Sequence, residues 1–555
     1  MNFLGKSQSR FSREKSSLRP SYFNNSPPLV VSYAQVCKQE NDDGSSLFSH
    51  KHYLRFVGHK AGQYGGLRTD HRHYPVWLKL KQTNLDLAHP LLIGLLCADQ
   101  GRPARNPVCM LRSCLAMMWC GETSFDDWVG LMRAEPFYAL ISGFNPTDVP
   151  GVGTFYDFQD RLLRRPRQPR MRKQAPHYRR EQQDKTAPQK DKNDLRPHQN
   201  IVNRLADRIL ARCYQPTPLA AMLEGFGEVS SLPSWEQTLQ PIFFACFVAH
   251  SVDLNLIDLD NLHVAGDGSK LPTWAKARGK KLCQCDNQGK KAEDHCRCDR
   301  AYRDPLARWG WDSYRECWVY GHSFYELTAY SFKHTCQLPL LLSMADCPRH
   351  DSVQGLVSLY RAQETFGLSL QTASLDAAHD ALGLYRLVTQ RWHTALVIPL
   401  NQRHEGHLHY AGPLRLEGGV PICLADQPMT RWGFCPDRLR IKWRCPLAAA
   451  KKSPELTACP FFDNGCSGSA YGRVVYTYPQ ENYRLHTLIP RDSHLWQCHR
   501  DARSCAERSV KRKKYDFHLL QTKTAGRDRW FFRLMLAAMG QHIDAWLTHA
   551  THRLN

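Results

Sequence analysis

The stretch Leu262-His-Val-Ala-Gly-Asp-Gly268 decides the fold class of this chain. It is a short apolar run that ends in an Asp-Gly pair, which predicts a buried strand with Asp267 at its end. The pattern that follows predicts strands at residues 318–328 and 338–343, a helix at 351–366, a strand at 369–375, a helix at 377–391 and a strand at 395–400. This order of strands and helices indicates an α/β fold in which helices cover the faces of a sheet.

Two predicted strands are followed by aspartates, Asp267 and Asp376, and Glu507 lies on a later predicted helix. Carboxylates at strand ends, together with one on a helix, can bind two divalent ions about 3.5–4 Å apart for in-line attack on a phosphodiester. We therefore predict these three residues as catalytic ligands of Mg²⁺ or Mn²⁺. Asp380 is an alternative to Asp376, but Asp376 follows its strand directly, where a rigid element holds a metal best. The structural alternatives are a turn for Asp267 and a helix N-cap for Asp376.

A strongly basic segment surrounds the third carboxylate: Arg503-Ser-Cys-Ala-Glu-Arg-Ser-Val-Lys-Arg-Lys-Lys514. Arg503, Glu507, Lys511 and Lys514 are spaced by four, four and three residues, so on a helix they share one face. A carboxylate among cations stays ionised and can ligate a metal, while Arg503, Lys511 and Lys514 hold a phosphate backbone against it. The alternative is a solvated helix with ordinary salt bridges.

These residues resemble the DDE transposases of bacterial insertion sequences. A signature of that family is Y-x-x-R-x-x-x-E-x-x-x-x-x-x-K, and Arg503, Glu507 and Lys514 stand at its offsets, while Arg500 takes the tyrosine position. Segments 99–107, 150–158, 304–312 and 538–546 are similar to the same family, so the resemblance runs from about residue 90 to 550.

The resemblance implies an RNase H-like catalytic core with a β-rich insertion between the second aspartate and the glutamate. It implies metal-dependent strand cleavage and transfer by 3′-hydroxyl attack, with terminal inverted repeats and target DNA as double-stranded partners and a homodimer in the synaptic complex. The alternatives are an RNase H-like nuclease without strand transfer and a catalytically inactive DNA-binding relative. A zinc-ribbon regulator would explain the charge and the cysteines but not the α/β core.

The composition changes along the chain predict six segments. They are a partly disordered leader at 1–85, a helical N-terminal DNA-binding domain at 86–163, a basic linker at 164–199, the first part of the core at 200–402, a β-rich cysteine-containing insertion at 403–490, and the C-terminal helices of the core at 491–555.

Charge and hydropathy favour a nucleic-acid partner over a membrane. The chain has 555 residues, with 74 Lys and Arg against 52 Asp and Glu, for a net charge of +22. A basic protein favours a polyanionic partner, and no apolar run approaches the roughly 20 residues that span a bilayer. The first residues lack the apolar core of a secretion signal. We expect a protein of the bacterial cytoplasm, associated with the nucleoid.

The 21 cysteines are expected to be free thiols or metal ligands, because disulfides are rare in the cytosol. Cys283, Cys285, Cys296 and Cys298 form two Cys-x-Cys pairs that can close around a structural zinc ion or remain a loop of reduced thiols. A second group, Cys423, Cys435, Cys445, Cys459 and Cys466, is spaced irregularly, so buried thiols are the favoured interpretation and zinc the alternative. Trp309, Trp311 and Trp318 could stack on bases, but aromatic residues at this density are usually core residues, so they are predicted to be core and are assigned no site.

Overall fold

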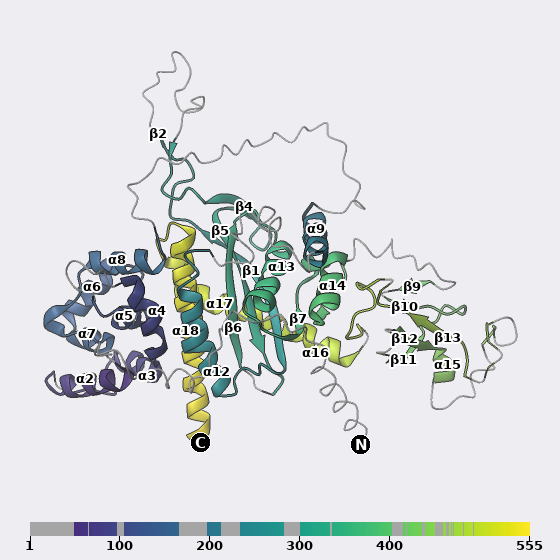
Figure 1. Cartoon of the computed structure of the whole chain (residues 1–555), viewed down its shortest axis with the longest axis horizontal. Helices are drawn as coiled ribbons and strands as arrows, with labels where there is room; N and C mark the ends of the chain where they lie inside the picture. The colour runs from purple at the N-terminus through teal and green to yellow at the C-terminus, as the bar shows by residue number, and fades with distance from the viewer. Residues whose placement is uncertain are drawn as a thin grey trace, which may run out of the picture.

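The computed structural model describes residues 49–64, 66–96, 105–165, 197–211, 233–281, 300–333, 336–401, 415–417, 419–435, 438, 440–449, 459–461, 466, 467, 469, 471–480, 482–491 and 493–554. A mixed sheet lies at the centre, with a group of helices on one side of it and a small β-rich part on the other (Figure 1). The predicted α/β class is therefore confirmed.

The central sheet has six strands in the order β4-β5-β1-β7-β8, with β6 paired to β5 beyond this path. The strands are β1 (Leu262–Pro272), β4 (Arg308–Asp312), β5 (Cys317–Tyr330), β6 (Gln337–Asp346), β7 (Leu370–Ser374) and β8 (Ala395–Val397). The pairs β1–β5, β5–β6 and β4–β5 are antiparallel, whereas β1–β7 and β7–β8 are parallel. Parallel neighbours need a crossover, and α13 and α14 supply the two crossovers here.

Asp267 lies in the middle of β1, so the prediction that the strand ends there is wrong. β1 pairs with β5 without a break from His263 opposite Tyr330 to Pro272 opposite Gly321. The long partner strand continues the ladder past the Asp-Gly pair, which removes the turn interpretation of Asp267. Asp376 does stand at the N-cap position of a short 3₁₀ turn, but its side chain makes no capping hydrogen bond.

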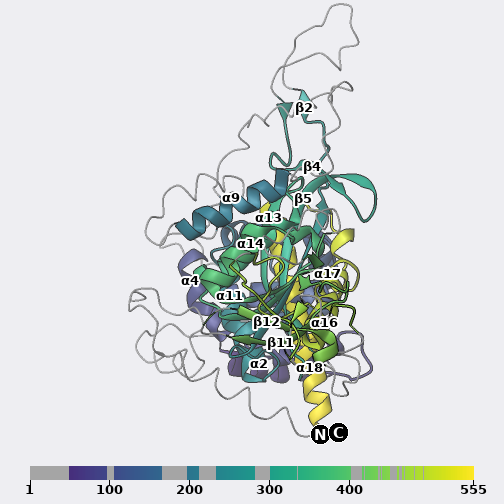
Figure 2. The same ribbon diagram turned by 90° about the vertical axis from the view of Figure 1, so that its right-hand side faces the viewer.

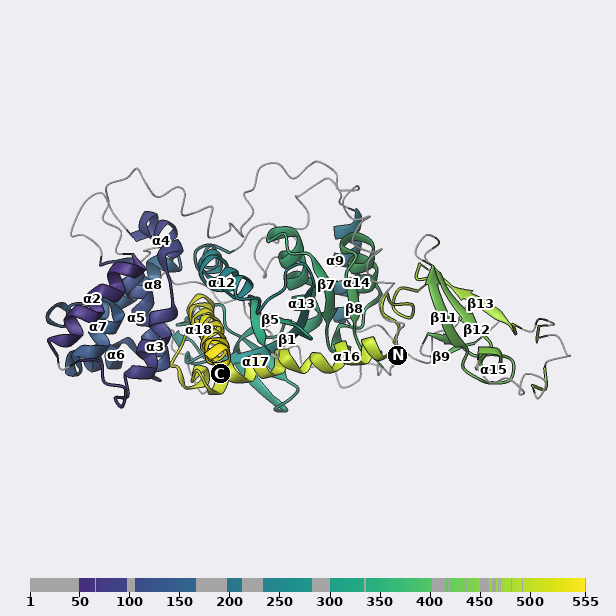
Figure 3. The same cartoon turned by 90° about the horizontal axis from the view of Figure 1, so that it is seen from below.

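Helices cover both faces of the sheet (Figure 3). α13 (Asp351–Tyr360) packs against β1, β5 and β6 on one face, beside α14 (Leu382–Leu387) and α9 (Pro197–Ala211). On the other face α16 (His494–Ala502) packs against β7 and β8, and α17 (Ser504–Tyr515) crosses β1, β5 and β6. α18 (Arg527–Leu554) packs along β6. The predicted helix at 377–391 is broken into a 3₁₀ turn, α14 and a π-helical turn at Val388–Trp392.

The N-terminal helical region begins upstream of the predicted boundary at residue 86. Its helices are α2 (His50–Gly62), α3 (Tyr74–Gln82), α4 (His89–Leu96), α5 (Pro107–Trp119), α6 (Phe125–Ala134), α7 (Pro136–Ser142) and α8 (Val152–Leu162). Tyr53 of α2 is buried and donates a hydrogen bond to the carbonyl of Ile141 at 2.7 Å, so α2 belongs to this bundle. Asn106 caps α5 by accepting hydrogen bonds from the N–H groups of Val108 and Cys109. Two short helices, α11 (Leu239–Phe243) and α12 (Ala249–Asp253), connect the bundle to the sheet.

The predicted β-rich insertion contains a separate antiparallel sheet, in the order β11-β12-β13. Its elements are β9 (Leu416–Glu417), β10 (Val420–Pro421), β11 (Thr430–Cys435), β12 (Arg440–Arg444), α15 (Pro446–Ala449) and β13 (Val474–Thr477). Met429, Ile441 and Trp443 form a small core of its own. It lies beyond the β8 edge of the central sheet (Figure 3).

The three tryptophans of the β4–β5 hairpin are not core residues, so that prediction is wrong. Trp309, Trp311 and Trp318 are all exposed. The opposite face of the hairpin is the packed one: Val319 is buried, and a Cβ added to Gly310 would lie 2.4 Å from the carbonyl oxygen of Cys347. Alternation along a strand then turns the tryptophans outward.

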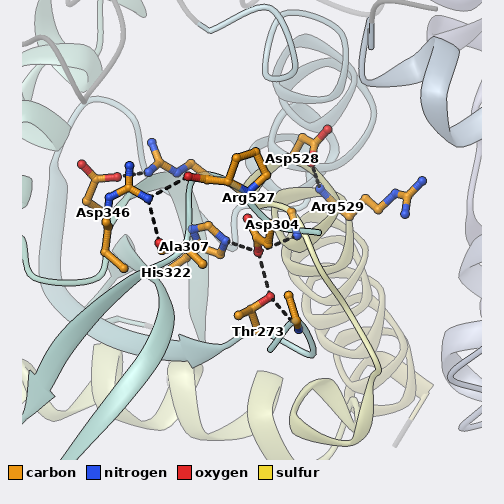
Figure 4. A network of polar contacts seen from close by, with 12 residues as sticks. Thr273, Asp304, Ala307, His322, Asp346, Arg527, Asp528 and Arg529 are labelled. Carbon is orange, nitrogen blue, oxygen red and sulfur yellow. Dashed lines mark hydrogen bonds and ion pairs between the residues drawn. The ribbon is translucent and has the colours of Figure 1, made fainter. Parts of the chain in front are cut away.

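A buried polar network links the chain segment between β1 and β5, residues 273–316, to the start of α18 (Figure 4). The same segment contains the short strand pair β2 (Lys280–Lys281) and β3 (Arg300–Ala301). Asp304 is 1% exposed, and its Oδ2 accepts hydrogen bonds from Thr273 Oγ1 at 2.7 Å and from the N–H of Gly526 at 2.9 Å, and lies 2.8 Å from His322 Nε2. Burial alone would raise the pKa of Asp304, but these partners, His322 first among them, lower it to about 2.

We expect Asp304→Asn to lower the free energy of unfolding at pH 7 by about 2 kcal/mol, because hydrogen bonds to a charged acceptor are lost. The folded pKa of Asp304 is about 2 and its ordinary value is 3.8, so its contribution is complete above about pH 4 and is lost as the pH falls toward 2. Urea unfolding of both proteins between pH 7 and pH 3 measures this difference. The control is Asp70→Asn, which removes only an exposed ion pair with Arg68 and should change little. Equal stability of Asp304→Asn and the wild type at pH 7 would contradict the assignment.

Candidate active site

The register of the central sheet places Asp267 and Asp376 beside each other. β1 and β7 run parallel, with Ala265 opposite Ser374, and each aspartate follows two residues after its paired residue. Neighbouring strands lie about 4.8 Å apart. Two aspartates that are far apart in the sequence therefore meet at the edge of the sheet where β7 ends.

The helix α17 brings Glu507 to the same part of the sheet. Cys505 and Ala506 pack against Ala265 of β1, and Glu507 is the next residue. Residues two apart on a strand share a face, so Asp267 points to the face that α17 covers. Glu507 is exposed, and its Oε1 accepts a hydrogen bond from Arg503 Nη2 at 2.5 Å. The structure thus brings together the three predicted carboxylates, with Arg503 among them.

Electrostatics shows how closely the carboxylates influence one another. Burial, followed by the negative charges of Asp351, Asp376 and Glu507, raises the pKa of Asp267 to about 7, and the positive charge of Arg503 only partly opposes this. A carboxyl group held this way gains from a proton or a cation nearby. An unrelieved concentration of negative charge is typical of functional sites rather than of stabilising surface networks.

Asp376 is held in its ionised form by a histidine that sequence reasoning did not assign. His379 Nδ1 is hydrogen-bonded to Asp376 Oδ1, and His379 Nε2 lies 2.9 Å from the hydroxyl of Tyr325. Burial raises the pKa of Asp376, but the charge and hydrogen bond of His379, with the charge of Arg503, lower it to about 2. The neighbouring aspartates therefore differ: one resists ionisation and the other is ionised at any ordinary pH.

A fourth carboxylate, Asp351, lies in the first turn of α13 and was not predicted. A Cβ added to Gly268 would lie 2.6 Å from Asp351 Oδ1, so the absence of a side chain at Gly268 lets the carboxylate approach β1. Burial raises the pKa of Asp351, and the charge of Lys270 opposes this. In the sequence Asp351 is indistinguishable from an ordinary acidic residue at a helix start.

The carboxylates have the donor atoms that Mg²⁺ and Mn²⁺ prefer, because these ions take oxygen ligands. Among the described residues, no group of three or more Asp, Glu, His or Cys side chains is arranged as a ligand set. One oxygen of Glu507 is engaged by Arg503, and one oxygen of Asp376 by His379. The chemistry of the donors fits the predicted ions.

Asp380, the alternative to Asp376, has a structural role. It is 2% exposed, and its two oxygens accept hydrogen bonds from the Arg484 guanidinium, both at 2.6 Å. Asp380 Oδ2 also accepts from the N–H of Asn401 at 2.7 Å. Asp380 thus links the segment after β8 to the segment before α16. Both oxygens of its carboxylate are engaged by the bidentate ion pair with Arg484.

The two predicted DNA-contacting lysines lie on α17 beyond Glu507 and differ in environment. Lys511 is exposed, as a residue that contacts phosphates needs to be. Lys514 donates a hydrogen bond to Ser269 Oγ, two residues after Asp267 on β1. Burial, then the charge of Arg315, lowers the pKa of Lys514, so Lys514 also lies near the tip of the β4–β5 hairpin.

A buried ion pair fastens α17 to the sheet directly opposite Asp267. Glu326 of β5 is the register partner of Asp267, and its Oε2 lies 2.7 Å from Lys513 Nζ, with both side chains fully buried. Ser509 donates a hydrogen bond to Glu326, and Lys513 donates to Gln541 of α18 at 3.2 Å. β5, α17 and α18 are therefore held together by one set of polar contacts, which determines where Glu507 stands.

The proposed zinc ligands Cys283, Cys285, Cys296 and Cys298 lie outside the described residues. Of the second group, Cys445 is buried and Cys423, Cys435, Cys459 and Cys466 are partly buried, all as free thiols. The charges of Cys445 and Cys459 contribute to the raised pKa of Cys466, after burial, so these three lie near one another.

Comparison with protein-family models, with curated proteins and with solved structures finds no match to this chain. Within the described ranges, no helix has the length and apolar character needed to cross a membrane.

We expect Asp267→Asn to raise the melting temperature at pH 8 without divalent cations by about 3 °C. The folded pKa of Asp267 is about 7 and its ordinary value is 3.8, so this residue destabilises the fold increasingly as the pH rises from about 4 to above 7. Mg²⁺ or Mn²⁺ should raise the melting temperature of the wild type but not that of the variant. Asp253→Asn, at an exposed position on α12, is the control. A lower melting temperature for Asp267→Asn under these conditions would contradict the assignment of Asp267 as a carboxylate whose charge destabilises the fold.

Lys513→Met should lower the free energy of unfolding by about 3–5 kcal/mol, because it leaves the buried Glu326 carboxylate without its cation. The double variant Lys513→Met with Glu326→Leu should recover most of this loss, since both charges are then absent. Denaturant unfolding measures all three proteins, with Lys511→Met on the exposed face of α17 as control. If the double variant is as unstable as the single one, the two side chains are not coupled.

Proposed function

We propose that this protein is a metal-dependent DNA transposase of the DDE type, with Asp267, Asp376 and Glu507 as its catalytic residues. The observations that carry the proposal are the sheet register, which sets Asp267 beside Asp376, and the packing of α17 on Ala265, which brings Glu507 to the same place. Burial and the charges of Asp351, Asp376 and Glu507 also raise the pKa of Asp267 to about 7. Carboxylates from two strands and a distant helix repel one another at a single edge of the sheet, and divalent cations relieve that repulsion.

The topology supports an RNase H-like core. Three antiparallel strands, β6, β5 and β1, are followed by two parallel strands, β7 and β8, and a separate small sheet precedes the helix that carries Glu507. This is the arrangement that the resemblance to DDE transposases implies.

Divalent ions held by these carboxylates would activate a water or a 3′-hydroxyl for attack and stabilise the leaving oxygen. The residues of the chain then have distinct roles. Asp376 is kept ionised by His379, which also fixes its orientation. Arg503 donates a hydrogen bond to Glu507, and its positive charge also acts on Asp267 and Asp376, so it offsets part of their negative charge and is a candidate contact for a phosphate.

The DNA backbone is expected to follow the exposed face of α17. Lys511 lies on that face, and Lys514 at its end contacts β1 beside Asp267. With a net charge of +22, the chain attracts double-stranded DNA over a long range. Terminal inverted repeats and target DNA are the proposed partners, and a homodimer is the proposed synaptic form.

Glu507→Gln should lower Mg²⁺-dependent cleavage of DNA that carries the gene's own flanking sequence by more than about 100-fold. Its affinity for the same DNA should stay within about twofold, since Arg503, Lys511 and Lys514 remain. Gel analysis of the cleaved strands and a binding titration in EDTA measure the two effects. Glu417→Gln, at an exposed glutamate of the insertion, is the control and should cleave normally.

Normal cleavage by Glu507→Gln would overturn the catalytic assignment. Joining of the cleaved 3′ ends to a target plasmid distinguishes a transposase from the RNase H-like nuclease, which would release ends without joining them.

A further inference from the structure

Four aromatic rings lie together on one face of the β4–β5 hairpin. Trp309 pairs with Tyr320 and Trp311 with Trp318 across the two strands. The ring centroids of these pairs are 5.3 Å and 5.6 Å apart, respectively. We call these four residues the aromatic ladder.

The aromatic ladder is open to solvent. Trp309, Trp311 and Trp318 are 46%, 48% and 60% exposed. A contiguous group of large apolar side chains on the surface marks an interaction site, because water hydrates it poorly. The hairpin also has a firm support, since Gly310 on its other face lies directly against Cys347. The rings are therefore displayed on a braced strand pair rather than on a loop.

The aromatic ladder belongs to the same face of the sheet as the carboxylates. β5 runs without a break from Trp318 to Glu326, and every second residue shares a face, so Trp318 and Tyr320 point to the side of Glu326 and its register partner Asp267. In Figure 2, β4 and the first part of β5 lie above α17. The ladder thus lies on the α17 side of the sheet, and the buried residues His322 and Phe324 of the same strand face separate it from Glu326.

Positive charge joins the aromatic ladder to the carboxylates. The turn at the tip of the hairpin carries Arg315, whose charge acts on Lys514, and Lys514 is bonded to Ser269 beside Asp267. Two acidic residues flank this arginine: Asp312, whose carboxylate accepts hydrogen bonds from the N–H groups of Tyr314 and Arg315, and Glu316, which is exposed. A strand of nucleic acid laid from the carboxylates along Lys514 and Arg315 would bring its bases over the rings.

The chemistry of the rings selects bases that are not paired. In a duplex, base faces are covered by stacking, whereas an unpaired base offers a face on which tryptophan and tyrosine stack in any sequence. Cations beside aromatic rings are the combination that binds single strands. A second copy of the chain, itself strongly basic, would meet Arg315 and Lys514 with like charge.

We propose that the aromatic ladder is a stacking site for unpaired DNA bases next to the phosphodiester that the carboxylates cleave. This inference rests on the proposed function. It adds that the DNA next to the cleaved phosphodiester is single-stranded when it is bound and that the β4–β5 hairpin binds its bases.

The test compares the affinity of the full-length protein for a 12-nucleotide oligo-dT with its affinity for a blunt duplex of equal length, in EDTA and at one salt concentration. Trp311→Ala with Trp318→Ala should weaken oligo-dT binding by about 10-fold or more and duplex binding by less than about twofold. Trp311→Phe with Trp318→Phe should retain most of the single-strand affinity. Trp432→Ala is the matched control, because Trp432 is also 48% exposed but lies on the insertion sheet, and it should leave the ratio of the two affinities unchanged.

An unchanged ratio in the double alanine variant would overturn the proposal. A change in the oligomeric state of that variant, measured by sedimentation, would also overturn it, because the aromatic ladder would then be an interface between copies of the chain. If the protein cleaves DNA normally and the ratio of the two affinities is unchanged in the double alanine variant, the stacking proposal is wrong and the transposase proposal is not affected. If the variant loses single-strand binding but the wild-type protein never cleaves DNA, the transposase proposal is wrong and the stacking site remains.

Discussion

The buried ion pair between Glu326 and Lys513 is the constraint on which the geometry of the site depends. Two charges without exposure to water are stable only when each compensates the other, so separating this pair is costly. Because Glu326 sits opposite Asp267 and Lys513 sits on the helix of Glu507, the pair fixes the helix relative to the strand. A purely apolar contact between α17 and the sheet would tolerate sliding by a fraction of a turn, which this ion pair resists.

Next to this ion pair the protein places carboxylates whose negative charges repel one another. Asp267, Asp351 and Glu507 contribute repulsion, and Arg503, His379 and Lys270 offset it only in part. The fold thus separates its two kinds of buried charge. The compensated pair lies under α17, and the partly compensated group lies at the edge where β7 ends. This separation is what a pre-organised electrostatic site requires.

The sequence was sufficient for the order of five of the six strands of the sheet and the helices between them, because periodicity and chain order carry that information, but β4 was not predicted. It also predicted Asp267 and Asp376, which the strand register sets side by side, and Glu507, which α17 brings to them. It did not reveal Asp351, because an aspartate at a helix start has the same pattern whether or not a glycine on a neighbouring strand lets it approach. Glu326 and Lys513 were missed because a charged residue in a strand or helix is usually at the surface, and only tertiary packing shows that these two are buried. The tryptophans of the hairpin were misassigned for the opposite reason: their burial depends on which face of the hairpin meets Cys347.

The position of α18 has a consequence for how the molecule is made. This helix packs against β6, α3, α5 and α11, all of which precede it in the chain. Roughly 180 residues separate the end of β6 from its start, which at ribosomal speed is a delay of about 10–40 s. During that interval the sides of β6, α3 and α5 that α18 covers lack their packing partner, so the core is completed only after α18 has been synthesised.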